Sequence, residues 1–522
     1  MRRAPSLIRS LAVLTATAAL LTACTSTQEN KDDNAASDDG KARPGTVRIL
    51  ASSELSDMAP VLDQVRKDTG ITVRPTYMGT LDAVTLVAKG LTDGKYDALW
   101  LSSNDYLRLR PEAAKKVVSE TPIMSSPVAI GIPQPVLTRL HWNPSDVTWG
   151  RLEQAVQDGK LTYGMTDPLR SNSGFSALVS VASALSGAQS ALTDEDVTKA
   201  APKLKEFFKG QELTSGSSGW LADAYKRRGN VDALLNYESV LKGIPGLTVI
   251  RPTDGVITAD YPLSSLASAT SAARQDIRRL TDALRTDSAQ RMITEKTYRR
   301  PVVPSVKPAA GLDTSRRREL PFPGSESVAT GLVDAYENKL RRPSRTVYVL
   351  DTSGSMKGDR LNRLKKALTD LTAGFREREE VTLMPFGSDV KGVRTHVISP
   401  SDPRSGLNAI RKDTDALSAN GSTAIYTSLE KAYEHLGTGG DTFTSIVLMT
   451  DGQNTTGAKA GEFDAFYRGL TPTEQETPVF PILFGDSDQA ELQHIADLTG
   501  GRLFDARTGS LDGAFEEIRG YQ

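Results

Sequence analysis

Short apolar runs alternate with amphipathic segments along the first half of the chain. Val47–Ala51 is apolar enough for a buried strand, and Leu55, Met58, Leu62 and Val65 follow it at the spacing of one helix face. The alternation continues and predicts strands at Ile71–Val73, Tyr96–Leu101, Pro127–Ile132 and Leu234–Ser239, with helices at Leu81–Leu91 and from Phe175 onward. Strands that alternate with helices predict an α/β fold with a parallel sheet.

A second series of strands and helices occupies the C-terminal third. Arg345–Leu350 is a continuous apolar run, as expected of a strand buried on both faces, and leucines at helical spacing follow it from Leu361 to Leu371. Further strands are predicted at Ser445–Thr450, Val479–Phe484 and Arg502–Phe504, and further helices at Ala490–Leu498 and Leu511–Ile518. This half therefore predicts a second α/β domain.

Length and composition narrow the class of protein. At about 150 residues per domain, 522 residues predict about three compact units, or two of which one is bilobed. Lys and Arg number 63 against 64 Asp and Glu, so no global field attracts nucleic acid or an anionic membrane surface. Cys24 is the only cysteine, and the four histidines show no metal-ligand spacing, which argues against disulfides and thiolate zinc sites.

The N-terminus has the pattern of a targeting segment. Arg2, Arg3 and Arg9 precede a mostly apolar stretch, Leu11–Leu21, which is too short for a relaxed transmembrane helix. The stretch ends in Leu-Thr-Ala before Cys24 and resembles the bacterial lipobox, although a conventional signal peptide with an incidental cysteine remains the alternative. The resemblance implies a signal peptide over residues 1–23, acylation of Cys24 and an extracytoplasmic, lipid-anchored location. Residues 24–44 are small and polar and are expected to form a disordered tether.

Small polar residues lie at the predicted strand ends of the first domain. Ligands bind beyond such ends in open α/β sheets. The order of these features resembles the type 2 periplasmic substrate-binding fold, especially its oxyanion-binding (molybdate-like) branch, and implies a bilobed domain over residues 45–307. The candidate contacts for a small-molecule or oxyanion ligand are Ser52, Ser53, Thr80, Ser126, Asn172, Ser173 and Tyr237. The alternatives are that these residues only cap their own helices, or that the lobes are a spacer without a ligand.

Residues 308–343 are expected to be a linker and a connecting helix. Pro, Ser and Arg dominate the stretch from Pro301 to Ser325, and Arg316–Arg318 is a basic run. No aromatic or further basic cluster accompanies the run, so a solvated linker is favoured over a nucleic-acid patch. A helix is predicted over Ser325–Leu340, before Pro343.

The second domain carries the clearest chemical motif. Asp351, Ser353 and Ser355 follow the strand Arg345–Leu350 directly, and alternating positions of an extended turn point the same way. Thr423 enters a helix after a Gly-containing loop, and Asp451 with Gly452 ends the strand Ser445–Thr450. Each piece alone also occurs as an ordinary turn, and Asp-Gly is common in hairpins. Together and in this order they resemble the metal-ion-dependent adhesion site (MIDAS) of von Willebrand factor type A (VWA) domains, which implies a doubly wound, Rossmann-like VWA domain over residues 344–522.

Such a site suits a hard cation. Five oxygen donors, two of them carboxylates, favour Mg²⁺, Mn²⁺ or Ca²⁺ over zinc or copper. By the resemblance, Ser353, Ser355 and Thr423 bind the metal directly, and Asp351 and Asp451 bind it directly or through water. An open position would then take a Glu or Asp of a protein partner.

The sequence does not favour an enzyme. Ser353 has no histidine near it in the chain, and neither a Gly-x-Ser-x-Gly elbow nor a phosphate-binding Gly-x-x-x-x-Gly-Lys-Ser/Thr loop is present there. We therefore expect a lipid-anchored surface binding or adhesion protein that captures its partner through the metal. The alternative is a solute receptor of a transport or sensing system, with the VWA domain as a docking module.

Overall fold

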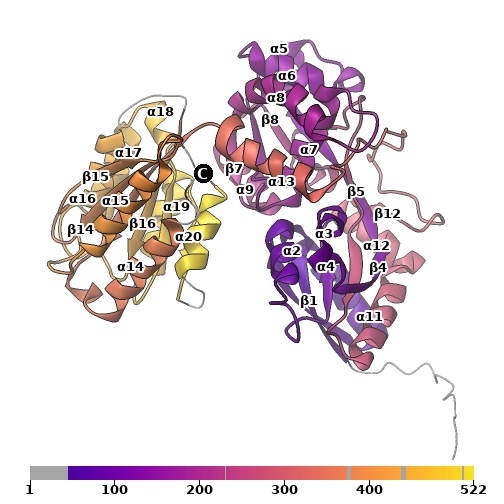
Figure 1. Ribbon diagram of the computed structural model, residues 1–522, viewed down its shortest axis with the longest axis horizontal. Coiled ribbons are helices and arrows are strands. Elements are labelled where there is room, and N and C mark those ends of the chain that lie inside the picture. Colours follow the sequence, from indigo (N-terminus) through magenta and orange to yellow (C-terminus); the bar gives the residue numbers. More distant parts are fainter. Residues whose placement is uncertain are drawn as a thin grey trace, which may run out of the picture. The chain divides into compact units, whose positions relative to one another are not determined.

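The computed structural model describes residues 45–229, 231–372, 375, 378–436, 442–507 and 511–521 (Figure 1). Three β-sheets organise this part of the chain, two in the first half and one in the C-terminal third. Cys24 and the expected tether over residues 24–44 lie outside the described residues. Within the described ranges, no helix is both long and apolar enough to cross a membrane.

The first lobe is built on a five-stranded sheet with the order β2-β1-β3-β11-β4. Its strands β1, β2 and β3 are parallel, whereas β11 runs antiparallel to both β3 and β4. The strands are β1 (Gly45–Ser52), β2 (Ile71–Met78), β3 (Ala98–Trp100), β4 (Val117–Pro122) and β11 (Pro262–Leu266). The helices are α1 (Ala59–Thr69), α2 (Thr80–Ala88), α3 (Asp105–Leu109), α4 (Pro111–Ala114), α11 (Ser271–Leu284) and α12 (Asp287–Thr297), and a 3-10 helix, η1 (Ser53–Met58), follows β1.

The second lobe is built on the sheet β10-β5-β8-β6-β7, with β9 and β12 also paired to β5. Only β6–β7 and β6–β8 are parallel pairs in this sheet. The strands are β5 (Met124–Pro133), β6 (Tyr163–Thr166), β7 (Gln211–Ser215), β8 (Ala233–Tyr237), β9 (Leu247–Ile250), β10 (Thr258–Ala259) and β12 (Arg300–Pro301). The helices are α5 (Gln134–Leu140), α6 (Trp149–Gln157), α7 (Asn172–Ser186), α8 (Asp194–Lys209), α9 (Ser218–Arg228) and α10 (Glu238–Lys242), with a 3-10 turn at Pro144–Asp146.

The chain crosses between the two lobes three times, at β4–β5, at β10–β11 and at α12–β12. The second crossing contains Tyr261, which is fully buried and has a φ of 43°. Its backbone N–H donates to Ser102 O at 2.9 Å, and its carbonyl accepts from the Trp100 indole at 3.1 Å. A non-glycine residue adopts this left-handed backbone conformation only when its surroundings fix it. The two hydrogen bonds therefore hold the backbone of the crossing at Tyr261 in place.

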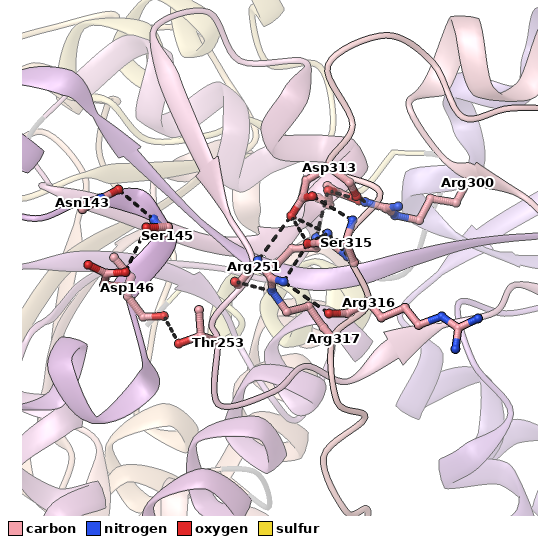
Figure 2. A network of polar contacts seen from close by, with 12 residues as sticks. Asn143, Ser145, Asp146, Arg251, Thr253, Arg300, Asp313, Ser315, Arg316 and Arg317 are labelled. Carbon is pink, nitrogen blue, oxygen red and sulfur yellow. Dashed lines mark hydrogen bonds and ion pairs between the residues drawn. The ribbon is translucent and has the colours of Figure 1, made fainter.

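The segment that follows β12 is held against the second lobe by hydrogen bonds and ion pairs. Arg251 donates to Asp313 at 2.5 Å and to Ser315 O at 2.9 Å, and Arg317 pairs with Asp313 at 3.3 Å (Figure 2). Burial raises the pKa of the Asp313 carboxyl, but the hydrogen bonds from the Ser315 N–H and hydroxyl, together with Arg251, outweigh it and hold this pKa well below its usual range. The basic run that the sequence suggested would be a solvated linker thus includes side chains that bond back to the fold.

The connecting helix is confirmed over nearly its predicted length. It consists of α13 (Glu326–Ala335), whose first turn is capped by Ser325, and a π-helical turn, η3 (Tyr336–Leu340). Tyr336 is buried, its hydroxyl donates to Gln211 Oε1 at 3.1 Å, and its ring lies 5.0 Å from that of Phe208. This helix therefore packs on the second lobe.

The C-terminal domain has one six-stranded sheet with the order β15-β14-β13-β16-β17-β18. All neighbours are parallel except β14 and β15. The strands are β13 (Ser344–Asp351), β14 (Glu380–Phe386), β15 (Arg394–Val397), β16 (Phe443–Thr450), β17 (Val479–Leu483) and β18 (Phe504–Asp505). The helices are α14 (Asp359–Leu371), α15 (Pro403–Asp415), α16 (Ile425–Leu436), α17 (Ala460–Gly469), α18 (Pro472–Gln475), α19 (Gln489–Thr499) and α20 (Leu511–Arg519), with a 3-10 turn, η4, at Gly354–Met356.

Two apolar cores lie on opposite faces of this sheet. Tyr348 and Leu350 of β13 face the core that α14, α15 and α20 complete, and Val347 and Val349 face the core of α16, α17 and α19. Neighbouring strand residues point to opposite faces, so an uninterrupted apolar run is what a strand covered on both sides requires. The expected doubly wound domain is confirmed.

The expectation of a parallel sheet in the first half needs correction. The α/β class and the two lobes are confirmed, but both sheets are mixed. The antiparallel members of the first sheet, β4 and β11, lie on either side of the crossings between the lobes. A chain that leaves one sheet and later returns to it runs in the opposite direction there, which the local alternation of strands and helices does not reveal.

Asp260, next to Tyr261 in the second crossing, offers a test of this hinge. Burial, with the nearby Asp105 carboxylate, raises the pKa of Asp260 to about 6. A raised carboxyl pKa costs stability once the group ionises, so the cost is absent near pH 4 and complete above pH 6. Asp260→Asn should therefore unfold at the same temperature as the wild type at pH 4 and should be more stable at pH 7, by about 1–2 kcal/mol because the site is partly exposed. Thermal melts across this range measure the difference.

The exposed Asp63 provides the matched control, since Asp63→Asn should leave the pH profile of the melting temperature unchanged. An Asp260→Asn advantage that is equal at pH 4 and pH 7 would contradict the account.

Candidate functional site

Three loops meet at the carboxyl ends of β13 and β16. The strands are parallel neighbours, with Leu350 opposite Met449, so Asp351 and Asp451 emerge side by side. The Thr450 hydroxyl donates to Asp351 Oδ2 at 2.6 Å and ties the two strand ends together. Because the chain leaves β13 for β14 on one side and reaches β16 on the other, this edge is the switch point of the sheet, where α/β folds bind ligands.

The Asp351 loop brings its own oxygens together. The Ser353 N–H donates to Asp351 Oδ1 at 2.8 Å, and the hydroxyls of Ser353 and Ser355 are 2.9 Å apart. The Ser355 hydroxyl in turn donates to Asp451 Oδ1 at 2.8 Å. Four of the five predicted metal ligands thus form one continuous hydrogen-bonded group.

The loop that carries Thr423 closes the group from the other side. The N–H of Gly354 donates to Gly421 O at 2.8 Å, and the N–H of Thr455 donates to Thr423 O at 2.8 Å. A Cβ placed on Gly452 would lie 3.9 Å from the Thr423 hydroxyl, so this hydroxyl is beside the turn that follows Asp451. The structure therefore assembles all five residues from three separate parts of the chain.

The donors fit a hard divalent cation. Adjacent ligands of an octahedral Mg²⁺ with bonds of about 2.1 Å lie roughly 2.9 Å apart, which is the separation of the serine hydroxyls. Asp351, Ser353, Thr423 and Asp451 are buried, whereas Ser355, Gly354 and Ser422 are exposed, so the group opens to solvent on one side. Among the described residues, no three His, Cys, Asp or Glu side chains gather in a metal-binding cluster, so a cation here would depend on hydroxyl donors.

Burial affects the acids of this site. It raises the pKa of the Asp351 carboxyl, and the nearby Asp451 adds to the rise, while the bonds from Thr450 and Ser353 oppose it. An arrangement that penalises two neighbouring negative charges is one that a bound cation would stabilise.

Two charged residues at this site escaped the sequence analysis. Arg360, on the first turn of α14, donates to Asp451 Oδ2 at 2.6 Å and to Asp486 at 2.8 Å. Lys391 donates to the backbone carbonyl of Thr352, in the Asp351 loop, at 2.6 Å. Arg360 holds the outer oxygen of Asp451 while the inner one faces Ser355. Neither belongs to the motif: Arg360 follows Ser355 by five positions on the next helix, whereas the pairing of β13 with β14 brings Lys391 to the loop.

The expected ligand contacts Ser52 and Thr80 of the first lobe are buried and hydrogen-bond to one another. The Ser52 and Thr80 hydroxyls are 2.8 Å apart, and Ser52 Oγ accepts from the Ser102 N–H at 2.9 Å. Ser52 precedes η1 but caps it with no side-chain hydrogen bond. These residues therefore do not serve as simple helix caps, the alternative that the sequence left open.

The contacts expected from the second lobe are also buried. The Asn172 amide donates to the Tyr237 hydroxyl at 2.8 Å, and Ser173 Oγ is 2.7 Å from the hydroxyl of Thr166 and 2.8 Å from that of Ser218. Ser126, on the crossing strand β5, donates to the Ser239 hydroxyl at 3.1 Å. Each second-lobe candidate thus bonds to a buried partner within the fold.

Ser53 alone among the seven candidates lines an open groove between the lobes. Tyr77, Gly79 and Arg170 line the same groove, as does Ser217 of the second lobe. Arg170 lies 3.7 Å from Asp82 across it, and a Cβ on Gly79 would come within 2.0 Å of Arg170 O. The rings of Tyr106 and Phe175 also meet across the lobes, 5.4 Å apart, so the lobes are in close contact.

Comparisons with known families agree with this architecture. Residues 47–299 match the family model described as bacterial extracellular solute-binding protein, and residues 346–453 match the von Willebrand factor type A domain. The chain therefore combines a solute-binding-like domain with a VWA domain, and the resemblance on which both predictions rested is confirmed.

A curated relative, an uncharacterized protein from Synechocystis sp., is 31% identical over 172 residues, or 32% of this chain. The matched part spans 39% of that relative's length.

The chain is also similar to several solved structures. The periplasmic binding protein AfuA from Actinobacillus pleuropneumoniae is 13% identical, with 57% of this chain and 98% of that chain covered and a TM-score of 0.44. The sulfate-binding protein SubI from Mycobacterium tuberculosis is 18% identical, with 50% and 88% covered and a TM-score of 0.39. A von Willebrand factor type A protein from Catenulispora acidiphila is 18% identical, with 34% and 42% covered and a TM-score of 0.30.

A cation held by these five residues would make the stability of the domain depend on the metal. Binding to the folded state alone stabilises it by about 2.7 kcal/mol when the metal is at 100 times its Kd. MgCl₂ should therefore raise the melting temperature of the wild type by several degrees. In Ser355→Ala, which removes an exposed hydroxyl, the rise should fall to below a third of the wild-type value. Differential scanning fluorimetry measures both.

Ser422→Ala is the control, because Ser422 is exposed beside Thr423 but is not among the five donors. An equal MgCl₂ response in Ser355→Ala and the wild type would exclude Ser355 as a ligand.

The close approach at Gly79 predicts a steric effect on the lobes. Gly79→Ala would force Arg170 O to move, because real Cβ contacts do not reach 2.0 Å. We expect a loss of about 1–3 kcal/mol in urea unfolding and faster proteolysis in the groove. Gly219→Ala, whose Cβ would meet nothing within 4 Å, should show neither effect. Unchanged stability in Gly79→Ala would mean that the lobes separate easily.

Proposed function

We propose that this protein is a surface binding protein that captures an acidic side chain of a protein partner through a divalent cation in its VWA domain. The observation that carries the proposal is the convergence of Asp351, Ser353, Ser355, Thr423 and Asp451 at the switch point, with an opening beside the exposed Ser355. Five preassembled oxygens leave an octahedral cation one position for an outside ligand.

The charge of the site favours a carboxylate as that ligand. Two carboxylates balance a divalent cation, so an incoming acid meets no surplus negative charge from the ligands themselves. The Arg360 guanidinium bridges Asp451 at 2.6 Å and the exposed Asp486 at 2.8 Å, so the open position on the cation is what would attract a carboxylate. Electrostatic complementarity of this kind would speed the encounter with an acidic partner and select against a basic one.

An extracytoplasmic location supports the proposal. The match of residues 47–299 to a bacterial extracellular solute-binding family is consistent with it. Acylation of Cys24 would anchor the chain to the membrane and leave both domains outside the cell, with residues 25–44 as a tether. In this arrangement the protein binds and presents, and we assign it no reaction.

The alternative function is that of a solute receptor whose VWA domain docks on a transporter or sensor. The groove between the lobes, lined by Ser53, Tyr77 and Arg170, favours it. The two functions differ in the step that needs the metal: capture of a protein requires the cation in the first, whereas solute binding does not require it in the second.

Capture should depend on the metal, on Ser355 and on partner carboxylates together. Full-length protein should retain envelope proteins from an extract in MgCl₂, with at least a tenfold loss in EDTA or in Ser355→Ala, and no loss in Ser422→Ala. Amidation of the carboxyl groups in the extract with a carbodiimide and ethanolamine should abolish retention as well. Quantitative mass spectrometry of the eluates measures all of these.

Equal retention of the same proteins in EDTA would exclude the metal bridge. Retention that needs the metal but survives amidation would mean that the partner offers another ligand than Glu or Asp.

A further inference from the structure

An acidic side chain lies among the hydroxyls of the first lobe. Glu54 follows the expected contacts Ser52 and Ser53 directly, on η1, and only 8% of it is exposed. The Ser102 hydroxyl donates to Glu54 Oε1 at 2.6 Å, a short bond of the kind that hydroxyls make to carboxylates. The carboxyl group therefore occupies a place where a bound anion would accept the same hydrogen bond.

The remaining hydroxyls of this cluster are engaged with one another. Ser52 Oγ accepts from the Ser102 N–H at 2.9 Å, and it lies 3.0 Å from the Ser102 hydroxyl oxygen and 2.8 Å from the Thr80 hydroxyl. Thr80 and Ser102 are 3.4 Å apart. Each of these side chains is at most 2% exposed. The donors with which the sequence would bind an oxyanion thus form a closed group that already includes an acceptor.

Charges around the cluster oppose a second anion. Arg299 is fully buried, but its guanidinium makes two bonds to Asp57, at 2.8 and 2.7 Å, and one to the backbone carbonyl of Glu54 at 3.1 Å. With both acids ionised, the three side chains sum to one negative charge. Burial raises the pKa of Glu54, and the Ser102 bond and Arg299 oppose that rise. A free oxyanion would therefore have to displace a carboxyl group and enter a region without a spare cation.

The cluster also lies where the two lobes meet. The Tyr237 hydroxyl of β8, in the second lobe, accepts from Asn172 and lies close to Ser102 and Glu54 of the first lobe. Its ring lies 5.9 Å from that of Tyr261 in the crossing, and Arg299 stands 4.9 Å over the Tyr261 ring. Residues of both lobes and of the hinge thus converge on the cluster that Glu54 completes.

We propose that Glu54 is an internal ligand of this cluster, which takes the place of a solute oxyanion and keeps the inner cleft closed to free tetrahedral oxyanions. The lobes then close on a side chain of their own chain instead of on a solute. The proposal concerns the first domain and does not depend on the metal site.

The test compares full-length wild type, Glu54→Gln and Glu54→Asp. Gln keeps the shape of the side chain, removes its charge and offers a donor, whereas Asp keeps the charge. Each protein is titrated with sulfate, molybdate or phosphate at up to 10 mM. The wild type and Glu54→Asp should show no heat of binding by isothermal titration calorimetry and no shift of the melting temperature. Glu54→Gln should bind at least one of these anions, with a Kd at least tenfold lower than the weakest Kd that the wild-type titration could detect.

Two results would overturn the proposal. If the wild type binds any of these oxyanions and Ser52→Ala abolishes that binding, the cluster of Ser52, Thr80 and Ser102 is open to solutes. A folded Glu54→Gln, judged by circular dichroism, that binds none of them would mean that the carboxyl group is not what excludes them. If Glu54→Gln fails to fold, Glu54→Ser makes the same comparison, because it also removes the carboxylate. The wild-type titration does not depend on either variant.

Discussion

The parallel pairing of β13 with β16 is the constraint on which the C-terminal site depends. Side chains at the carboxyl ends of two adjacent parallel strands must emerge at the same edge, and the register fixes Asp351 beside Thr450 and Asp451. Both strands are buried on both faces by separate apolar cores, so a change of register would expose a row of buried side chains. The positions of the two carboxylates are therefore as well determined as the core of the domain.

The two domains use the same structural rule with opposite results. In each, hydroxyl-bearing residues follow a parallel strand, and the chain turns into a helix directly afterwards. In the VWA domain the hydroxyls of Ser353 and Ser355 lead from a buried carboxylate toward solvent, because Gly354 and Ser355 stay exposed. In the first lobe, Ser52, Thr80 and Ser102 are buried together, and Glu54 provides the acceptor that a solute would otherwise supply.

The sequence predicted the C-terminal site better than the N-terminal one for a physical reason. Asp351, Ser353 and Ser355 belong to one loop whose spacing alone makes their oxygens converge, and only Thr423 and Asp451 had to be placed by the fold. The apolar strands 345–350 and 445–450 were equally clear, and both are confirmed. Strand β14 was missed, because Glu380 begins it and Pro385 interrupts its apolar pattern.

In the first domain the contacts that matter join residues far apart in the chain. Ser102 bonds Ser52 and Glu54 across about fifty positions, and Arg299 reaches Glu54 and Asp57 from more than two hundred positions away. Glu54 in isolation is an ordinary acid at the start of a helix, where a negative charge is common. Its role depends on the antiparallel return of β11 and the crossing at Tyr261, which bring the hinge and Arg299 against η1. The local pattern identifies hydroxyls suited to an anion, but only the assembled lobe shows that the chain itself provides one.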